Sequence, residues 1–130
     1  MFDWLANPNR FNRITEKIQP YILLIAIISL ISGLYFGLFD SPKDYQQGDA
    51  VRIMYVHVPS AWLASFLYFS LAMSCIFYLV WKHPLADLVS SSIAPIGALF
   101  SALTLVTGSL WGKPMWGTWW VWDARLTSML

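Results

Sequence analysis

The chain has 130 residues, of which 58% are hydrophobic and only 12% are charged, with a formal net charge of +1. Soluble domains carry about 25% charged and about 45–50% apolar residues, so the composition argues against a soluble globular protein. The near-neutral charge gives no electrostatic support for nucleic-acid binding. Cys75 is the single cysteine, which excludes an internal disulfide and a C-x-x-C-H motif. The sequence contains no zinc-ligand cluster, P-loop or dinucleotide-binding fingerprint.

The first 110 residues alternate polar and apolar stretches in a pattern typical of membrane proteins. Residues 1–20 form a polar head that carries Arg10, Arg13 and Lys17, and residues 21–39, 61–81 and 88–110 are apolar and uncharged. About 20 apolar residues in a helix span a hydrocarbon core of about 30 Å. We therefore predict an all-α polytopic membrane protein with three transmembrane helices. Because positive flanks remain in the cytoplasm, the N-terminus is expected on the inside.

This orientation places the connecting segments. Residues 40–60 become an external loop, residues 82–87 a short cytoplasmic turn, and residues 111–125 a second external segment. The third span contains Pro95 and several hydroxyl residues, so we expect it to pack against protein rather than lipid. The sequence then ends at residues 126–130, which read as the start of a fourth transmembrane helix. We expect further spans to follow in a longer protein.

The first external loop contains the stretch "GDAVRIMYVHVPSAW". Asp49 is expected to cap a short helix from Ala50 to about Val56. Pro59 disfavours helical geometry just before it and suits the first turn of the second span. This pattern predicts that His57 lies at a break in the chain, at the depth of the outer membrane interface.

Two interpretations remain open for His57 and for Arg52, which both lie in this loop. His57 is either an interfacial histidine bonded to a loop carbonyl or a ligand to a metal or haem iron. Arg52 either anchors a lipid headgroup or pairs with a ligand carboxylate such as a propionate. His83 lies in the cytoplasmic turn and is interpreted as a surface residue, whereas Met73 and Cys75 are interpreted as packing residues.

The second external segment, "WGKPMWGTWWVWDAR", contains five of the eight tryptophans. Gly112, Pro114 and Gly117 are expected to break any long helix. Tryptophans are common at membrane interfaces, so an ordinary aromatic belt is one explanation. The density of the rings favours a platform for a large planar ligand, for which porphyrin, quinone and sugar all remain candidates.

A short helix from Trp116 onward predicts which side chains form this platform. At about 100° per residue, Trp116, Trp119, Trp120 and Asp123 share one face, and Arg125 falls on the other. We expect Trp116, Trp119 and Trp120 to form an apolar floor. Asp123 is expected to cap the next helix, or to hold an indole N–H or an arginine in place.

Two motifs resemble a known family. "WGxPxWGxxWxWDxRLT" (residues 111–127) resembles the WWD signature of haem-handling membrane proteins, and "RIMYVHVPSAW" (residues 52–62) resembles the first external loop of the CcmC family of haem exporters. The resemblance covers essentially the whole chain in span order. It implies that the WWD segment holds non-covalent haem b at the external face. It also implies that His57 is the first of two external axial ligands, the second lying beyond the WWD segment.

The resemblance further implies a role in cytochrome c maturation. Such a protein binds haem and passes it to the chaperone CcmE, together with the ABC-type ATPase complex subunits CcmA, CcmB and CcmD. It would lie in a bacterial or organellar inner membrane, and it would not itself be an enzyme, with any ATP hydrolysis coming from a partner. Arg52 and Arg125 would pair with the haem propionates.

Two other functions stay open on the sequence. The first is a fragment of a WWD-type cytochrome c haem lyase or synthetase, for which more spans and more external histidines would be expected. The second is a purely structural membrane subunit, in which Trp111, Trp122 and the other tryptophans form an aromatic belt.

Overall fold

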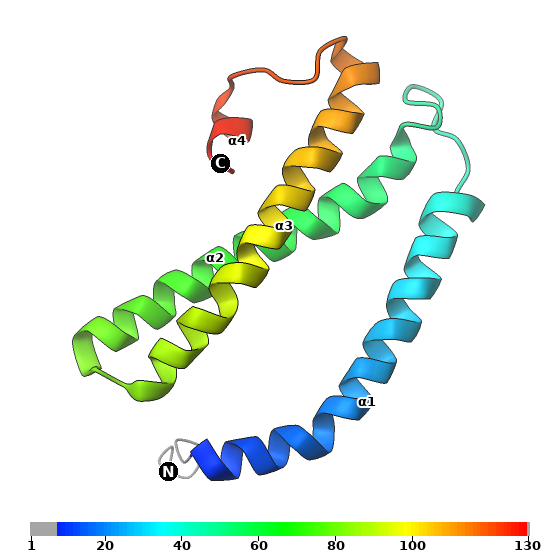
Figure 1. The fold of residues 1–130 in the computed structure, drawn as a ribbon. Helices are drawn as coiled ribbons and strands as arrows, with labels where there is room; N and C mark the ends of the chain where they lie inside the picture. The colour runs from blue at the N-terminus through cyan, green and yellow to red at the C-terminus, as the bar shows by residue number, and fades with distance from the viewer. Residues whose placement is uncertain (1–7, 130) are drawn as a thin grey trace.

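The computed structural model describes residues 8–129 and consists of helices and their connections (Figure 1). Three of the described helices are long and apolar enough to cross a membrane. This confirms the predicted all-α fold with three long apolar helices. Residues 1–7 of the predicted head and Leu130 lie outside the described part. In chain order the elements are α1 (Pro8–Tyr35), the π-helical turn η2 (Phe36–Asp40), α2 (Val51–Trp81), α3 (Pro84–Trp116) and the short α4 (Ala124–Thr127).

The long helices extend beyond the apolar stretches of the sequence. Helix α2 begins at Val51 and runs through Pro59, and α3 continues through Pro114 to Trp116. The predicted chain break before Pro59 is therefore wrong. A proline removes only its own N–H donor, and a helix of a membrane protein tolerates this when neighbouring groups compensate for the carbonyl left unpaired.

Helices α2 and α3 form an antiparallel pair joined by a tight turn. Lys82 closes α2 in the left-handed region at φ 52°, and its N–H donates to the Tyr78 carbonyl at 2.8 Å. Such a left-handed C-terminal residue reverses the chain directly after a helix. His83 then precedes the proline that begins α3, in agreement with its interpretation as a turn residue.

The α2–α3 interface is built from small side chains. Ser60 and Ala64 of α2 are each 3% exposed, and Thr104 and Thr107 of α3 are 5% and 8% exposed. Each of the three hydroxyls donates to a carbonyl one turn earlier in its own helix, at 2.7–2.8 Å. Because their polar groups are satisfied internally, these residues let the two helices approach closely.

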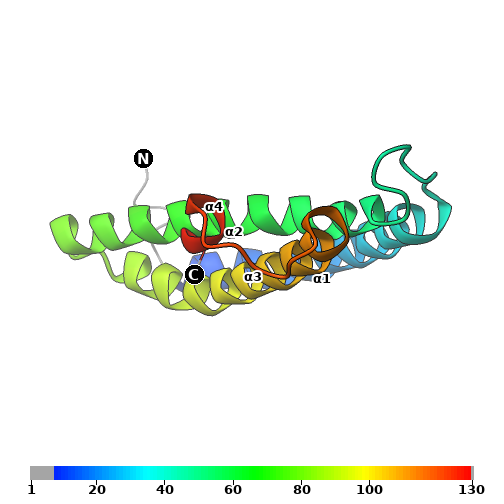
Figure 2. The same ribbon diagram turned by 90° about the horizontal axis from the view of Figure 1, so that it is seen from above.

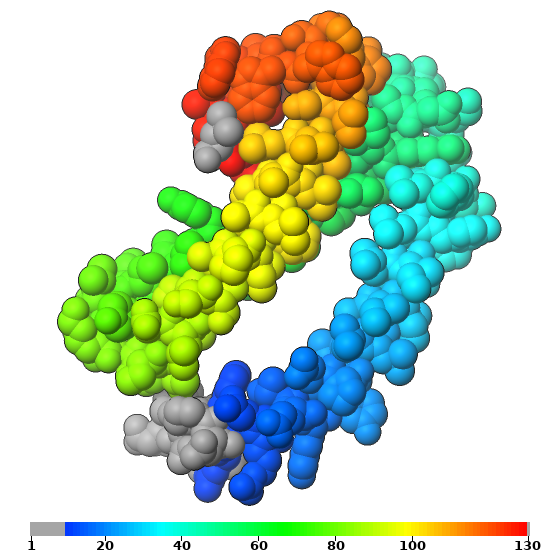
Figure 3. Space-filling model, viewed as in Figure 1, coloured from blue at the N-terminus to red at the C-terminus, as the bar shows by residue number. Residues whose placement is uncertain are grey.

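Helix α1 stands apart from this pair over much of its length, and the space-filling view shows an opening between them (Figure 3). Contact between the first helix and the pair runs mainly through η2. There Gly37 is buried, and a Cβ at this position would come within 3.0 Å of the Tyr55 Cβ. Viewed from above, α2 and α3 lie next to each other, with the segment that leads to α4 crossing α3 (Figure 2).

The two segments predicted to share one membrane face do lie at the same end of the molecule (Figure 1). One is the connection between η2 and α2, where Asp44 and Gly48 pair their backbones in a turn. The other, residues 111–125, begins in the last turns of α3 and continues past its end. A hydrogen bond from Trp111 Nε1 to Gln47 Oε1, 2.9 Å long, joins them across 64 residues of sequence.

Candidate functional site

His57 lies within the second turn of α2 and faces α3. Its Nδ1 is 3.0 Å from the Thr107 Oγ1. The ring also lies against Gly108, where a Cβ would come within 3.1 Å of the His57 Cε1. The imidazole therefore contacts a neighbouring helix, and the loop carbonyl expected in the simpler interpretation is not its partner. The sequence signals of the loop gave no indication of Thr107 or Gly108, which lie 50 residues further along the chain.

Arg52 turns back toward its own loop. One of its terminal nitrogens donates to the Ser41 carbonyl at 3.2 Å, and the other lies 3.8 Å from the Asp49 carboxylate. Its Nε is buried and has no hydrogen-bond partner. A hydrogen bond from Lys43, 2.7 Å from Asp49, lowers the pKa of that carboxyl. The guanidinium is thus held close to the start of α2 with one donor still unsatisfied.

Asp49 does not cap α2 as predicted. The residue before the helix is Ala50, which has no side-chain cap. The carboxylate of Asp49 pairs instead with Lys43 and Arg52, because the charged partners compete successfully with the backbone amides. The loop is closed by ion pairs rather than by a helix cap.

The tryptophan-rich segment is not the short helix that the sequence predicted. Helix α3 incorporates Gly112 and Pro114 and ends at Gly117, whose φ of 76° places it in the left-handed region and whose N–H donates to the Lys113 carbonyl at 3.0 Å. Residues 118–123 are then irregular. The predicted common face of Trp116, Trp119, Trp120 and Asp123 is therefore wrong, because the chain reverses between the first ring and the others.

The tryptophans gather in pairs instead. Trp111 and Trp116 meet edge to face at 5.0 Å between ring centroids, and Trp120 and Trp122 do so at 5.5 Å. The Nε1 of Trp120 is buried without a hydrogen-bond partner. An unsatisfied indole donor beside exposed aromatic faces suits an apolar ligand that carries an acceptor.

Asp123 caps α4, as predicted from the sequence. Its carboxylate accepts the Leu126 N–H at 2.9 Å and two hydrogen bonds from Arg125, at 2.7 and 3.1 Å. The Leu126 amide and the guanidinium together lower the pKa of Asp123. Arg125 also lies over the Trp116 ring, 5.5 Å from its centroid. Asp123 thus fixes an arginine against the aromatic cluster, one of the roles expected for it.

The structure does not bring His57 and Trp119 together. The Trp119 ring lines a shallow hollow with Leu105, Val106, Ser109 and Leu110 of α3. At about 100° per residue, these positions lie on the side of α3 opposite to Thr107 and Gly108. Helix α3 therefore separates the imidazole from the Trp119 ring.

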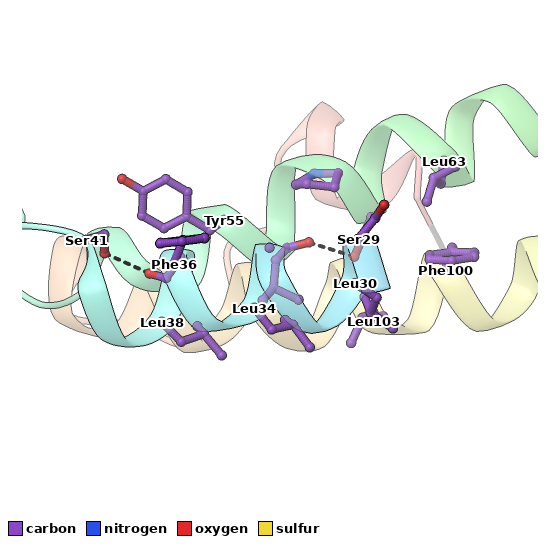
Figure 4. A pocket seen from close by; sticks show the side chains of 15 residues that line it. Ser29, Leu30, Leu34, Phe36, Leu38, Ser41, Tyr55, Leu63, Phe100 and Leu103 are labelled. Carbon is purple, nitrogen blue, oxygen red and sulfur yellow. Dashed lines mark hydrogen bonds between the residues drawn. The ribbon is translucent and has the colours of Figure 1, made fainter. Parts of the chain in front are cut away.

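A groove between the first helix and the α2–α3 pair was not predicted (Figure 4). It is an apolar cavity of about 560 Å³ between the end of α1 with η2 on one side and α2 and α3 on the other, and Tyr55, Val56 and Leu103 contribute to its wall. One sequence signal was available. Small residues recur every fourth position from the last turns of α1 to the residue after η2, and they line the groove: Ser29, Gly33, Gly37 and Ser41.

These features define a class, the multi-pass helical membrane proteins with a histidine and a tryptophan-rich segment at one end of a helix pair. The family model described as CcmC, Heme exporter protein C, matches residues 1–130. The chain belongs to the heme exporter protein C family.

Individual relatives agree with the family assignment. The chain is 52% identical over 126 residues to a heme exporter protein C of Bradyrhizobium diazoefficiens, covering 97% of this chain and 48% of the relative. The heme exporter protein C of Escherichia coli K12 is 48% identical over 126 residues, covering 97% and 51%. A putative cytochrome c biosynthesis ccmC-like mitochondrial protein of Marchantia polymorpha is 56% identical over 98 residues, covering 75% and 43%. The chain thus spans about half the length of these relatives.

Proposed function

We propose that this chain forms part of a haem-delivery protein of cytochrome c maturation, with His57 as an axial ligand to the iron of haem b. The observation that carries the proposal is the position of the imidazole. Its Nδ1 is occupied by Thr107 at 3.0 Å, which leaves Nε2 as the nitrogen that binds iron. A histidine whose second nitrogen is hydrogen-bonded is the common arrangement for a metal ligand.

Other groups at this end of the molecule suit the rest of a porphyrin. Haem offers a flat apolar surface and two propionates, and the chain offers indole faces, the buried unpaired donors Trp120 Nε1 and Arg52 Nε, and the exposed guanidinium of Arg125. We propose that Trp116, Trp119 and Trp120 contact the ring and that Arg52 and Arg125 pair with the propionates. Trp111 and Trp122 hold the segment at the interface, and Asp123 positions Arg125.

Because α3 separates His57 from Trp119, haem binding in this proposal brings the tryptophan-rich segment over the end of α3. The segment is suited to this role, since residues 118–123 have no regular structure and a glycine in the left-handed region joins them to α3. The second axial histidine lies beyond the WWD segment, in a part of the longer relatives that the chain does not cover.

We further propose the partners and the orientation that the family implies. The protein lies in a bacterial or organellar inner membrane with its N-terminus in the cytoplasm and its haem site on the opposite side. It hands haem to CcmE and works with CcmA, CcmB and CcmD, and the ATPase partner supplies the energy of ATP hydrolysis. The chain presents and transfers its ligand without changing it chemically.

Absorption spectroscopy of the protein as the cell produces it tests this function. We expect a Soret band in the purified protein, and we expect His57→Ala to remove or shift it while membrane insertion is unchanged. His83→Ala, in the turn after the opposite end of α2, is the matched control and should behave as wild type. A wild-type spectrum for His57→Ala would refute the ligand assignment. Recovery of an apocytochrome instead of CcmE as the co-purifying protein would favour a haem lyase.

A further inference from the structure

The contact between His57 and α3 determines which nitrogen of the imidazole carries the proton. Two hydrogen-bonding groups meet there, the imidazole Nδ1 and the Thr107 hydroxyl, with 3.0 Å between them. Either group can donate or accept, so the position of the proton on the imidazole depends on where the hydroxyl proton goes. The other contacts of Thr107 decide this.

The Thr107 hydroxyl already donates its only proton. Its Oγ1 lies 2.7 Å from the Leu103 carbonyl and 3.2 Å from the Thr104 carbonyl, and both of these oxygens are pure acceptors. Thr107 is 8% exposed, so a competing water is largely excluded. With the proton committed, Oγ1 offers His57 only a lone pair, and Nδ1 must be the nitrogen that carries hydrogen.

Gly108, the next residue of α3, lets the imidazole ring approach the helix closely. A Cβ at this position would come within 3.1 Å of the His57 Cε1 and 3.6 Å of Nδ1. The first distance is tighter than ordinary van der Waals contact, so any side chain at 108 would push the imidazole away from Thr107. The absence of a side chain at this position lets the ring lie directly on the backbone of α3.

We propose that Thr107 and Gly108 form a seat for His57 that places the proton of the neutral imidazole on Nδ1, leaving Nε2 unprotonated and pointing away from the seat. Thr107 is a positioning residue, since it acts through His57. The seat rests on the proposed function for its purpose, because the unprotonated Nε2 is the form that coordinates iron. The tautomer itself is a property of the chain without haem.

The first test therefore needs no haem. Side-chain ¹⁵N NMR of the apo protein, labelled at histidine and measured at mildly alkaline pH, distinguishes protonated from unprotonated ring nitrogens, and His57→Ala assigns the signal. We expect protonated Nδ1 in the wild type and in Thr107→Ser. Thr107→Val removes the acceptor and should give a mixed or Nε2-protonated ring. Thr104→Val removes a buried hydroxyl one turn away that donates to the Phe100 carbonyl, and it is the matched control.

The second test uses the haem-loaded protein. Removing an acceptor of the Nδ1 proton makes the imidazole a weaker electron donor, so Thr107→Val should lower the iron–imidazole stretching frequency in resonance Raman spectra and raise the reduction potential. Haem affinity should fall by about 10- to 100-fold, the usual loss when a partner of a metal-binding histidine is removed. Gly108→Ala should change the same spectrum by displacing the ring, and Thr107→Ser should restore it.

The outcomes separate the seat from the proposed function. A wild-type His57 protonated on Nε2 would overturn the seat, as would a Thr107→Val protein with the wild-type tautomer and stretching frequency. A His57→Ala protein with the wild-type haem spectrum would instead refute iron ligation by His57, and the NMR result would still decide the tautomer.

Discussion

The surroundings of His57 and the tryptophan-rich segment are both expected to contact the same ligand, yet they are built in opposite ways. His57 lies in the second turn of a long regular helix and contacts Thr107 and Gly108 of the neighbouring helix. The tryptophans after Gly117 lie on an irregular segment that is held by local interactions such as the Asp123–Arg125 pair. The two regions also lie on different sides of α3.

This difference indicates a division of roles. A ligand to iron must have a defined distance and direction, which a pair of packed helices supplies. A flat apolar surface needs only to cover a ring, and pairs of indoles on an irregular segment can do this after a small rearrangement. The histidine side is therefore expected to set the geometry and the tryptophan side to set the retention of haem.

The largest expected effect that distinguishes the histidine side from the tryptophan side is a loss of haem retention when indole rings are removed. Replacing Trp119 and Trp120 together by alanine should reduce haem retention by roughly 10- to 100-fold, since an aromatic contact contributes about 0.5–1.5 kcal/mol beyond the area it buries. The position of the Soret band should change little, because the axial ligand remains. Titration with haem, followed by tryptophan fluorescence quenching and absorption, measures both.

Trp81→Ala at the C-terminal end of α2 is the control for this prediction, because its side chain is similarly exposed, at 64% against 55% for Trp119. Equal losses in the control and in the double variant would favour an aromatic belt over a haem platform.

The arginines test whether the ligand bridges the two regions. Arg52 belongs to the histidine side and Arg125 to the tryptophan side. A charge-assisted hydrogen bond contributes about 1.5–3 kcal/mol, so Arg52→Ala and Arg125→Ala should each weaken haem binding by roughly tenfold or more. If only one of the two variants lost haem affinity, the propionates would be assigned to the side of that arginine. Unchanged affinity in the double variant would leave both residues with a role in anchoring lipid headgroups.

The smallest effect concerns the cap of α4. The Leu126 amide and Arg125 lower the pKa of Asp123 below its ordinary value of 3.8. Because the pKa is depressed in the folded state, the cap is fully present above that ordinary value and is lost as the pH falls through the lowered pKa. The hydrogen-exchange protection factor of the Leu126 amide should therefore decrease on acidification. Asp123→Asn keeps an acceptor that does not titrate, so a matching decrease in this variant would contradict the explanation.

The three long helices could be predicted because each contains an uncharged apolar stretch of membrane-spanning length. Their ends could not, since the prolines were interpreted as boundaries. Pro59 and Pro114 each remove one donor from a helix that is otherwise stabilised on both sides of them. This stabilisation cannot be predicted from the residues next to each proline, because much of it comes from the packing of α2 on α3.

Within the candidate site, one of the two helix caps predicted from local sequence, that by Asp123, was correct, the cap by Asp49 was wrong, and contacts between distant residues were not predicted. The cap by Asp123 depends on three consecutive peptide units, and it was predicted correctly. The face shared by Trp116 and Trp119 depended on a helix continuing past Gly117, and there the left-handed backbone ended it. The contact of His57 with Thr107 joins residues 50 positions apart, and only the register of the two helices determines it.

The lengths of α2 and α3 determine how deep the imidazole sits. At a rise of about 1.5 Å per residue, the 31 residues of α2 measure about 46 Å and the 33 residues of α3 about 50 Å. An upright helix of that length, centred on a hydrocarbon layer of about 30 Å, extends past each surface by about 8–10 Å. His57 lies about 9 Å from the first residue of α2, and in that placement it would be at the level where hydrocarbon gives way to headgroups. A ligand bound there can keep its apolar ring in the oily layer while its carboxylates reach water.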